Sequence, residues 1–390
     1  MSSAQLTRQI LPLTSLRFFA AAAVVLHHGR DAFQQALGFL NGVQLALGVS
    51  FFFVLSGFIL THVHHDLSGP EQIKKFYVSR IARIWPTHLF TFALVILLVP
   101  TSLWFMPHME KHGVMAAAAN LTLIQSWIPM VGFYFSINGV SWSISTEMFF
   151  YLLFPWLIAG WNRTWHWKTA LAAGLLVGIL AVSIALPVPE LDINKPLTVS
   201  SHGLLYGWPL ARLFEFTVGM CMALLYRRLD PIAGGLSRYG WLALELCMPL
   251  VLWAAWKGWW HAASAVFSPI PRPFFSMPAG FMTVAFGLAV LVFALSRGPV
   301  AACLSWRPLV VLGEASFSLY MVHQIVMNVV IAHHGWMEAP SQWALFGLIV
   351  VVALSLSLLM WTGIEMPAKR AIVAWAGSRR AVVPPRQSAG

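Results

Sequence analysis

Charged side chains are scarce in this sequence. Of its 390 residues only 9% are Asp, Glu, Lys or Arg, whereas 59% are hydrophobic. Soluble domains contain about 25% charged residues, so this chain has too little polar surface to cover a water-soluble globule of its length. The composition therefore excludes an ordinary soluble enzyme and predicts an integral membrane protein, whose apolar outer surface faces lipid.

Cysteine is scarce as well. The three cysteines form no Cys-x-x-Cys pair and lie in or beside apolar stretches: Cys221, Cys247 and Cys303. Among the histidines, His62, His64 and His65 have no carboxylate or cysteine at a useful spacing except Asp66, and an interfacial location suits them better. We therefore predict neither a disulfide framework nor a metal site.

Long apolar runs, by contrast, are abundant. A helix that crosses about 30 Å of hydrocarbon needs about 20 residues, and ten segments are long enough: 13–34, 42–63, 76–100, 141–161, 168–187, 207–227, 240–257, 279–297, 308–332 and 342–364. Segment 115–127 is shorter and contains Asn120 and Gln125, which favours a re-entrant or interfacial helix. The first run lacks a signal-peptide cleavage site, so we expect it to remain in the mature protein.

The net charge of +11 reflects topology rather than a nucleic-acid surface, because the basic residues form short clusters between apolar segments. With the N-terminus in the cytoplasm, 17 of the 24 lysines and arginines fall in inside segments and five in outside segments. This bias is the positive-inside pattern. We predict an all-α fold, a polytopic membrane helix bundle of about ten transmembrane helices plus the short one, with both termini cytoplasmic. One membrane domain spans residues 1–370, and 371–390 form a flexible tail.

An ionisable residue at membrane depth is costly and therefore marks a candidate site. Arg17 and His28 are 11 residues apart, which places them on one face of a helix with a rise of about 16 Å. A cation near the cytoplasmic end and an imidazole farther along suit a long ligand with a phosphate head, such as coenzyme A. Arg17 as a snorkelling residue and His28 as an interhelical hydrogen-bonder are the structural alternatives. His27 lies about 100° round the helix, so we favour His28.

Two further clusters can be either functional or structural. Arg80 and Arg83 are three residues apart on one side of a helix and can grip phosphate, or they can be ordinary positive-inside charges. Ser143 and Glu147, beside Trp142, can be a helix cap, or they can place a carboxylate at the outer membrane boundary, where it orients an imidazole or a sugar hydroxyl.

The last candidates lie in the C-terminal half. Arg212 and Glu215 are three residues apart and can neutralise each other as a structural ion pair. Tyr320 and His323 are spaced in the same way, and His323 either binds substrate or fixes helix packing.

Taken together, these residues resemble the membrane-bound acyltransferase 3 family, which O-acylates bacterial surface carbohydrates and similar acceptors. The resemblance rests on segments in the family's order: Leu13 to Arg17 through His28, Gly48 to Gly57, Arg80 with Arg83, Ser141 to Pro155, Arg212 to Gly219 and Ser316 to His323. The resemblance covers nearly the whole chain. Within the family, the chain is most similar to the stand-alone branch, whose members have no C-terminal hydrolase-like domain.

The resemblance implies that His28 is the catalytic histidine and that Glu147 is a functional carboxylate near the acceptor side. It assigns Arg17, Arg80 and Arg83 to the acyl-CoA donor. The expected reaction moves an acyl group, by default acetyl, from cytoplasmic acyl-CoA to a carbohydrate or glycolipid hydroxyl outside the bacterial plasma membrane. We also expect substrate contacts from six residues: Trp142, Ser143, Arg212, Glu215, Tyr320 and His323.

Some alternatives stay open at this stage. His28 can act as a general base or carry the acyl group covalently. The acyl group and the acceptor are not readable from the sequence. Ten spans with buried charges also suit a secondary transporter in which Arg17, His28 and Arg212 relay an ion or anion. Transporters often contain paired halves, and this sequence shows no such symmetry, so we favour the enzyme.

Overall fold

The fold is a bundle of helices. The computed structural model describes residues 9–65, 67–186, 188–266, 281–332 and 342–378. It is all-helical, with 82% of residues in helices and no strand in the described part of the chain. The all-α prediction is therefore confirmed. Short 3-10 segments and two π-helical turns, Gly203–Gly207 and Trp361–Glu365, link or continue the helices.

The α-helices follow one another along the chain with short connections. They are α1 (Leu11–Ala32), α2 (Gln34–Leu37), α3 (Gly48–Val63), α4 (Pro70–Leu98), α5 (Gly113–Leu121), α6 (Val131–Tyr134), α7 (Trp142–Ile158), α8 (Trp161–Ala185), α9 (Pro209–Ala233), α10 (Arg238–Val266), α12 (Phe281–Leu295), α13 (Pro299–Leu304), α14 (Arg307–Glu314), α15 (Ser316–Ala332), α16 (Gln342–Met360) and α17 (Met366–Ser378).

Every apolar segment predicted from the sequence coincides with a helix or a pair of helices. Among the described residues, seven helices are long and apolar enough to cross a membrane: those built on α1, α3, α4, α8, α9, α10 and the continuous α16–α17. An eighth span arises if α14 and α15, which meet at 62°, are counted together. The remaining two segments fold as the shorter helices α7 and α12. The protein is a multi-pass membrane protein, and the count of ten stays a prediction.

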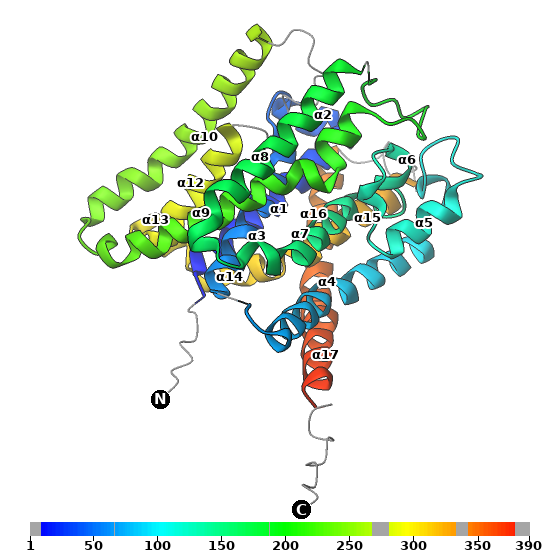
Figure 1. Ribbon diagram of the computed structural model, residues 1–390. Helices are drawn as coiled ribbons and strands as arrows, with labels where there is room; N and C mark the ends of the chain where they lie inside the picture. The colour runs from blue at the N-terminus through cyan, green and yellow to red at the C-terminus, as the bar shows by residue number, and fades with distance from the viewer. Residues whose placement is uncertain (1–8, 66, 187, 267–280, 333–341, 379–390) are drawn as a thin grey trace, which may run out of the picture.

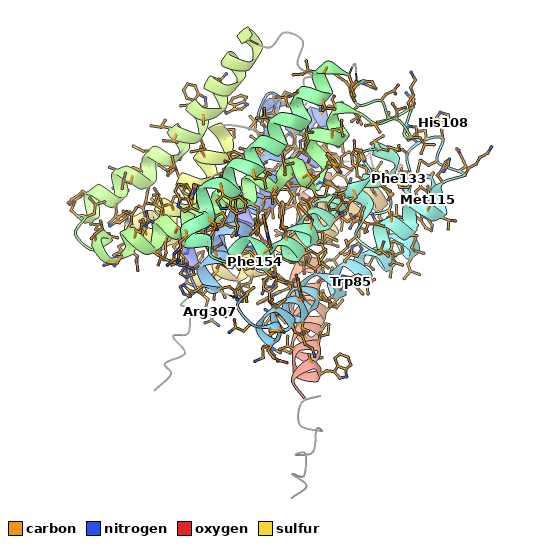
Figure 2. All side chains as sticks on the ribbon, in the orientation of Figure 1. Trp85, His108, Met115, Phe133, Phe154 and Arg307 are labelled. Carbon is orange, nitrogen blue, oxygen red and sulfur yellow. The ribbon has the colours of Figure 1, made fainter. Side chains whose placement is uncertain are left out.

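Figure 1 shows how these helices are arranged. The start of α1 and the end of α17 lie at the same lower end of the bundle, whereas α10 lies along one flank and α5 and α6 along the other. In the view of Figure 2, Arg307 lies toward the lower end and His108 toward the upper end. Six basic residues lie near one another around the first half of α4 and the start of α17, and we call this region the basic end: Arg17, Lys74, Lys75, Arg80, Arg83 and Lys369.

The most extensive contact in the bundle is the crossing of α3 and α9. It depends on two glycines, because a Cβ atom on Gly57 would overlap the carbonyl oxygen of Phe216, and one on Gly219 would overlap that of Val54. Small residues allow the backbones of membrane helices to approach closely. This crossing brings the middle of α3 into the centre of the protein, where it forms a wall of the candidate site.

Helix α7 starts inside the bundle rather than at its surface. The residues that precede and open it, Ser136, Asn138, Ser141 and Ser143, are all buried. At its other end the helix stops at Ile158, and the ammonium group of Lys168 donates hydrogen bonds to the carbonyl oxygens of residues 156, 157 and 159. These donors satisfy the carbonyl groups that a helix end leaves unpaired.

The short segment 115–127 folds as most of α5 followed by a 3-10 turn, Gln125–Trp127. Helix α5 is too short to span a membrane. Its two polar side chains explain its position. Asn120 donates to the backbone oxygen of Ser136 at 2.8 Å, and Gln125 donates to that of Ser141 at 3.1 Å. The amides that made this segment a poor transmembrane helix therefore attach it to the start of α7.

The C-terminal end differs from the expectation of a flexible tail from residue 371. A π-helical turn continues α16 directly into α17, which extends to Ser378. Residues 371–378 are thus helical, and one wall of a cavity described below comes from this helix. Residues 379–390 lie outside the described residues.

Candidate active site

A cavity of about 250 Å³ lies between α1, α3, α4, α7 and α15. Its polar lining comes from helices that are distant in sequence: Arg17 of α1, Arg80 and Arg83 of α4, Glu147 of α7 and Tyr320 of α15. Apolar side chains of α3 form much of the remaining wall. The structure therefore brings all three arginines of the predicted donor site to one place.

The three arginines are available to a ligand. Within the described ranges, no carboxylate oxygen lies within 4 Å of the guanidinium groups of Arg17, Arg80 or Arg83. Arg80 lies over the rings of Phe76 and Tyr151, at 5.8 and 5.6 Å from their centres. Glu147 and Glu365 act on Arg83 through space without pairing with it directly, so the three guanidinium groups keep net positive charge and N–H donors for an anion.

Glu147 lies in the same cavity, where hydroxyl groups hold it. Its Oε1 atom accepts hydrogen bonds from Tyr151 at 2.5 Å and from Ser56 at 3.3 Å. We expected this carboxylate at the outer membrane boundary, beside the acceptor. The structure places it instead with the arginines, because α7 starts inside the bundle and its second turn already faces the interior.

Ser143 and Tyr320 form the inner end of the cavity. Their hydroxyl oxygens lie 2.8 Å apart, and the Tyr320 hydroxyl also lies 3.1 Å from the carbonyl oxygen of Val140. Both side chains line the cavity although 177 positions separate them. Trp142 does not line it and packs against Tyr206, with ring centres 4.3 Å apart.

His28 lies beyond this inner end and is not one of the residues that line the cavity. The ring centres of Tyr320 and His323 are 5.9 Å apart, and those of His323 and His28 are 5.2 Å apart. His28 and His323 are hydrogen-bonded, with Nδ1 of the former 3.0 Å from Nε2 of the latter. Tyr320 and His28 are thus both neighbours of His323, and His28 lies close to the cavity without lining it.

His27 has a different partner from His28. Nη2 of Arg30 lies 3.1 Å from Nδ1 of His27. Because a guanidinium group can only donate, this nitrogen must accept, and the proton of the neutral ring is on Nε2. The lone pair of His27 is thus already used, whereas His28 faces another imidazole.

Arg212 and Glu215 form an ion pair that the fold separates from the cavity. Nε of Arg212 lies 2.8 Å from Oε2 of Glu215, and both side chains are buried. The guanidinium group also lies over the rings of Phe53, Trp142 and Tyr206, at 5.0 to 5.6 Å. This arrangement favours the structural interpretation of the pair over substrate binding.

A second, larger cavity of about 910 Å³ adjoins the first at the basic end. The two cavities share Val63 and His64 as lining residues. Lys74 and Lys75 of α4 line the second cavity, and α17 contributes Val373 and Ala376. Burial and the positive charge of Arg80 lower the pKa of His64 to about 4, so this imidazole is neutral at physiological pH.

Several lining residues were not predicted from the sequence. Tyr151 lies one helical turn after Glu147, and this i, i+4 spacing was the available signal. Ser56 and His64 carry no local signal, since each acquires its role from a helix that packs against it.

The fold and the site define a class: a multi-pass membrane protein with an internal, arginine-lined cavity that leads toward a histidine pair. The chain belongs to the family described as the acyltransferase domain, whose model matches residues 12–362. The protein is therefore a membrane acyltransferase, which confirms the resemblance seen in the sequence.

Known relatives support this membership. The chain is 30% identical to acyltransferase MdmB of Streptomyces mycarofaciens, over 95% of this chain and 93% of the relative. It is 27% identical to nodulation protein 10 of Rhizobium leguminosarum, over 91% and 92%. It is 24% identical to peptidoglycan O-acetyltransferase OatA of Listeria monocytogenes, over 83% of this chain and 50% of that protein. No solved structure matches it significantly.

Proposed function

We propose that this acyltransferase moves an acyl group, by default acetyl, from cytoplasmic acyl-CoA to a carbohydrate hydroxyl outside the bacterial plasma membrane. One observation carries the proposal. Arg17, Arg80 and Arg83 converge on a cavity at the basic end with no carboxylate within 4 Å among the described residues. Three arginines beside Glu147 and Glu365 leave a net positive charge, which favours an anionic ligand, and the positive-inside rule assigns the basic end to the cytoplasm.

The sizes of the two cavities suit two different parts of a coenzyme A molecule. A cavity of about 250 Å³ is small by the standards of ligand pockets, which measure about 300–1,000 Å³, so it suits an acyl-pantetheine arm and not the whole molecule. The adjoining cavity of about 910 Å³ has room for the nucleotide. Lys74 and Lys75 then face the 3′-phosphate of the nucleotide. The arginines hold the diphosphate that joins the nucleotide to the pantetheine arm.

The thioester of such a ligand points toward Ser143 and Tyr320, and His28 lies behind them. The ring of Tyr320 has to move aside for the thioester to reach His28, which breaks the 2.8 Å contact with Ser143. His28 then acts as a general base on the acceptor hydroxyl, which is worth roughly 10²–10⁴-fold in rate, or it carries the acyl group covalently.

The acceptor reaches His28 from the other side of the membrane. A carbohydrate is the best-supported acceptor, because relatives of this chain include a peptidoglycan O-acetyltransferase. Membership of an acyltransferase family also favours the enzyme over a transporter that uses the same buried charges.

The direct test is mass spectrometry of surface glycans from cells that carry the intact gene, no gene, or the His28→Ala variant. We expect one O-acyl group that depends on the gene and is missing in the variant. Glycans that are identical in all three strains would contradict the proposed acceptor class. Rapid release of CoA by the purified protein without any acceptor would select the covalent route over the general-base route.

A further inference from the structure

His323 is the hydrogen-bonded neighbour of His28 and is fully buried in α15. Its Nδ1 atom lies 3.2 Å from the carbonyl oxygen of Leu319, one turn earlier in the same helix. A carbonyl oxygen only accepts hydrogen bonds, so the contact requires a proton on Nδ1 of His323. The backbone therefore fixes the tautomer of this ring.

The tautomer of His323 sets the hydrogen-bond role of the His28 nitrogen that faces it, and His28 also has a backbone hydrogen bond to Val24. In a neutral ring with its proton on Nδ1, the Nε2 atom is an acceptor. That atom lies 3.0 Å from Nδ1 of His28, so Nδ1 of His28 must donate. No carboxylate lies within 4 Å of either ring among the described residues. The lone pair of His28 is consequently on its Nε2 atom.

We propose that His323 is a positioning residue that makes Nε2 of His28 the reacting atom. This inference rests on the proposed function of His28. The order Leu319 carbonyl, His323, His28, acceptor hydroxyl resembles the order carboxylate, histidine, hydroxyl in serine hydrolases, where the group hydrogen-bonded to the histidine fixes its tautomer and orientation. The carbonyl of Leu319 and the ring of His323 together replace the carboxylate.

The chemistry balances on this arrangement. Nε2 of His28 takes the proton of the acceptor hydroxyl while the new C–O bond forms and the C–S bond of the thioester breaks. The sulfur leaves with the bonding electron pair and receives the proton from Nε2, which gives the ester and free CoA thiol. Throughout, Nδ1–H of His28 donates to His323, which stabilises the transient imidazolium ion.

The test uses full-length protein in inverted membrane vesicles, with radiolabelled acetyl-CoA as donor and the native glycan of the vesicles as acceptor. We expect His323→Leu to lower kcat about 10²–10⁴-fold, with the KM for acetyl-CoA changed by less than about 2-fold. His323→Gln places a side-chain oxygen near the position of Nε2 and should retain activity within about 10-fold of the wild type.

Two controls separate positioning from packing. His88 of α4 is equally buried, and its Nε2 atom lies 3.0 Å from a backbone oxygen, that of Asn120, far from His28 in sequence. His88→Leu should therefore leave kcat per folded molecule unchanged. In a His28→Ala background, His323→Leu should cause no further loss, because residues that act as one unit are not additive.

Equal losses in His323→Gln and His323→Leu, or full activity of His323→Leu while His28→Ala is inactive, would overturn this inference and leave the proposed function intact. Full activity of His28→Ala would overturn both. If His323→Leu does not fold, ¹⁵N NMR of histidine-labelled wild-type protein decides the matter. The wild-type resonances that disappear in His28→Gln belong to His28, and they should show a proton on Nδ1. A proton on Nε2 instead would refute the assignment.

Discussion

The hydroxyl group of Tyr151 lies 2.5 Å from Oε1 of Glu147, one turn apart on α7. This bond, with a second from Ser56, holds the carboxylate among hydroxyl groups instead of against a guanidinium group. The three arginines of the cavity consequently keep most of their donors for a ligand, although Nε of Arg80 donates to Ser79 at 3.2 Å. Glu147 contributes negative charge to a strongly positive cavity and so limits how tightly it holds an anion.

Glu147→Gln should therefore tighten donor binding. The amide oxygen can still accept from Tyr151, while the lost charge removes the repulsion between the carboxylate and the anionic donor. We expect the KM for acetyl-CoA to fall about 2–10-fold and kcat to fall with it, because CoA leaves more slowly. Initial rates in membrane vesicles measure both, and a raised KM would count against this role.

Neutralising an arginine of the cavity should have the opposite effect. Arg83→Gln removes charge-assisted hydrogen bonds worth about 1.5–3 kcal/mol, so we expect the KM for acetyl-CoA to rise roughly 10- to 150-fold. The matched control is Arg163→Gln, since Arg163 is exposed and remote from both cavities. Similar KM values for the two variants would remove the cavity from donor binding.

The second cavity predicts a smaller effect at its exposed lysines. Exposed ion pairs contribute about 0.2–1 kcal/mol each, so the double variant Lys74→Gln, Lys75→Gln should raise the KM for acetyl-CoA about 2–30-fold. It should also discriminate less between acetyl-CoA and its 3′-dephospho analogue, because the 3′-phosphate has lost its partners. Lys195→Gln, at an exposed position outside both cavities, should change neither value. Unchanged discrimination in the double variant would move the nucleotide elsewhere.

The crossing of α3 and α9 predicts which glycines the fold cannot lose. Gly219→Leu forces a side chain into the backbone of Val54, and overpacking of this kind costs about 1–3 kcal/mol or more. We expect a lower midpoint of thermal unfolding in detergent and a lower yield of folded protein. Gly178→Leu is the control, because a Cβ atom there meets nothing within 4 Å. Equal stability of both variants would contradict the described packing.

Hydropathy and charge bias located the apolar segments well, because the width of the bilayer sets the length of a spanning helix. The spacing of Arg17 and His28 was readable for a similar reason, since both lie on α1 and helix geometry fixes their common face. The three arginines were also assigned to one ligand before the structure placed them in one cavity.

The partners of these residues were not readable. His28 and His323 are 295 positions apart, and their pairing depends on how α1 packs against α15. Glu147 was expected too near the outer surface, because the apolar run that contains it does not reveal that α7 starts inside the bundle. Hydropathy reports the depth of a segment and not its neighbours.

The central claim is that His28 carries out acyl transfer, and its neighbour provides the sharpest comparison. His27 and His28 lie on the same helix with rings 5.2 Å apart, but the lone pair on Nδ1 of His27 already accepts from Arg30. Transfer of radiolabelled acetyl from acetyl-CoA to vesicle glycan should fall at least about 100-fold in His28→Ala and stay near the wild-type rate in His27→Ala. Full transfer by His28→Ala, or loss only in His27→Ala, would contradict the account.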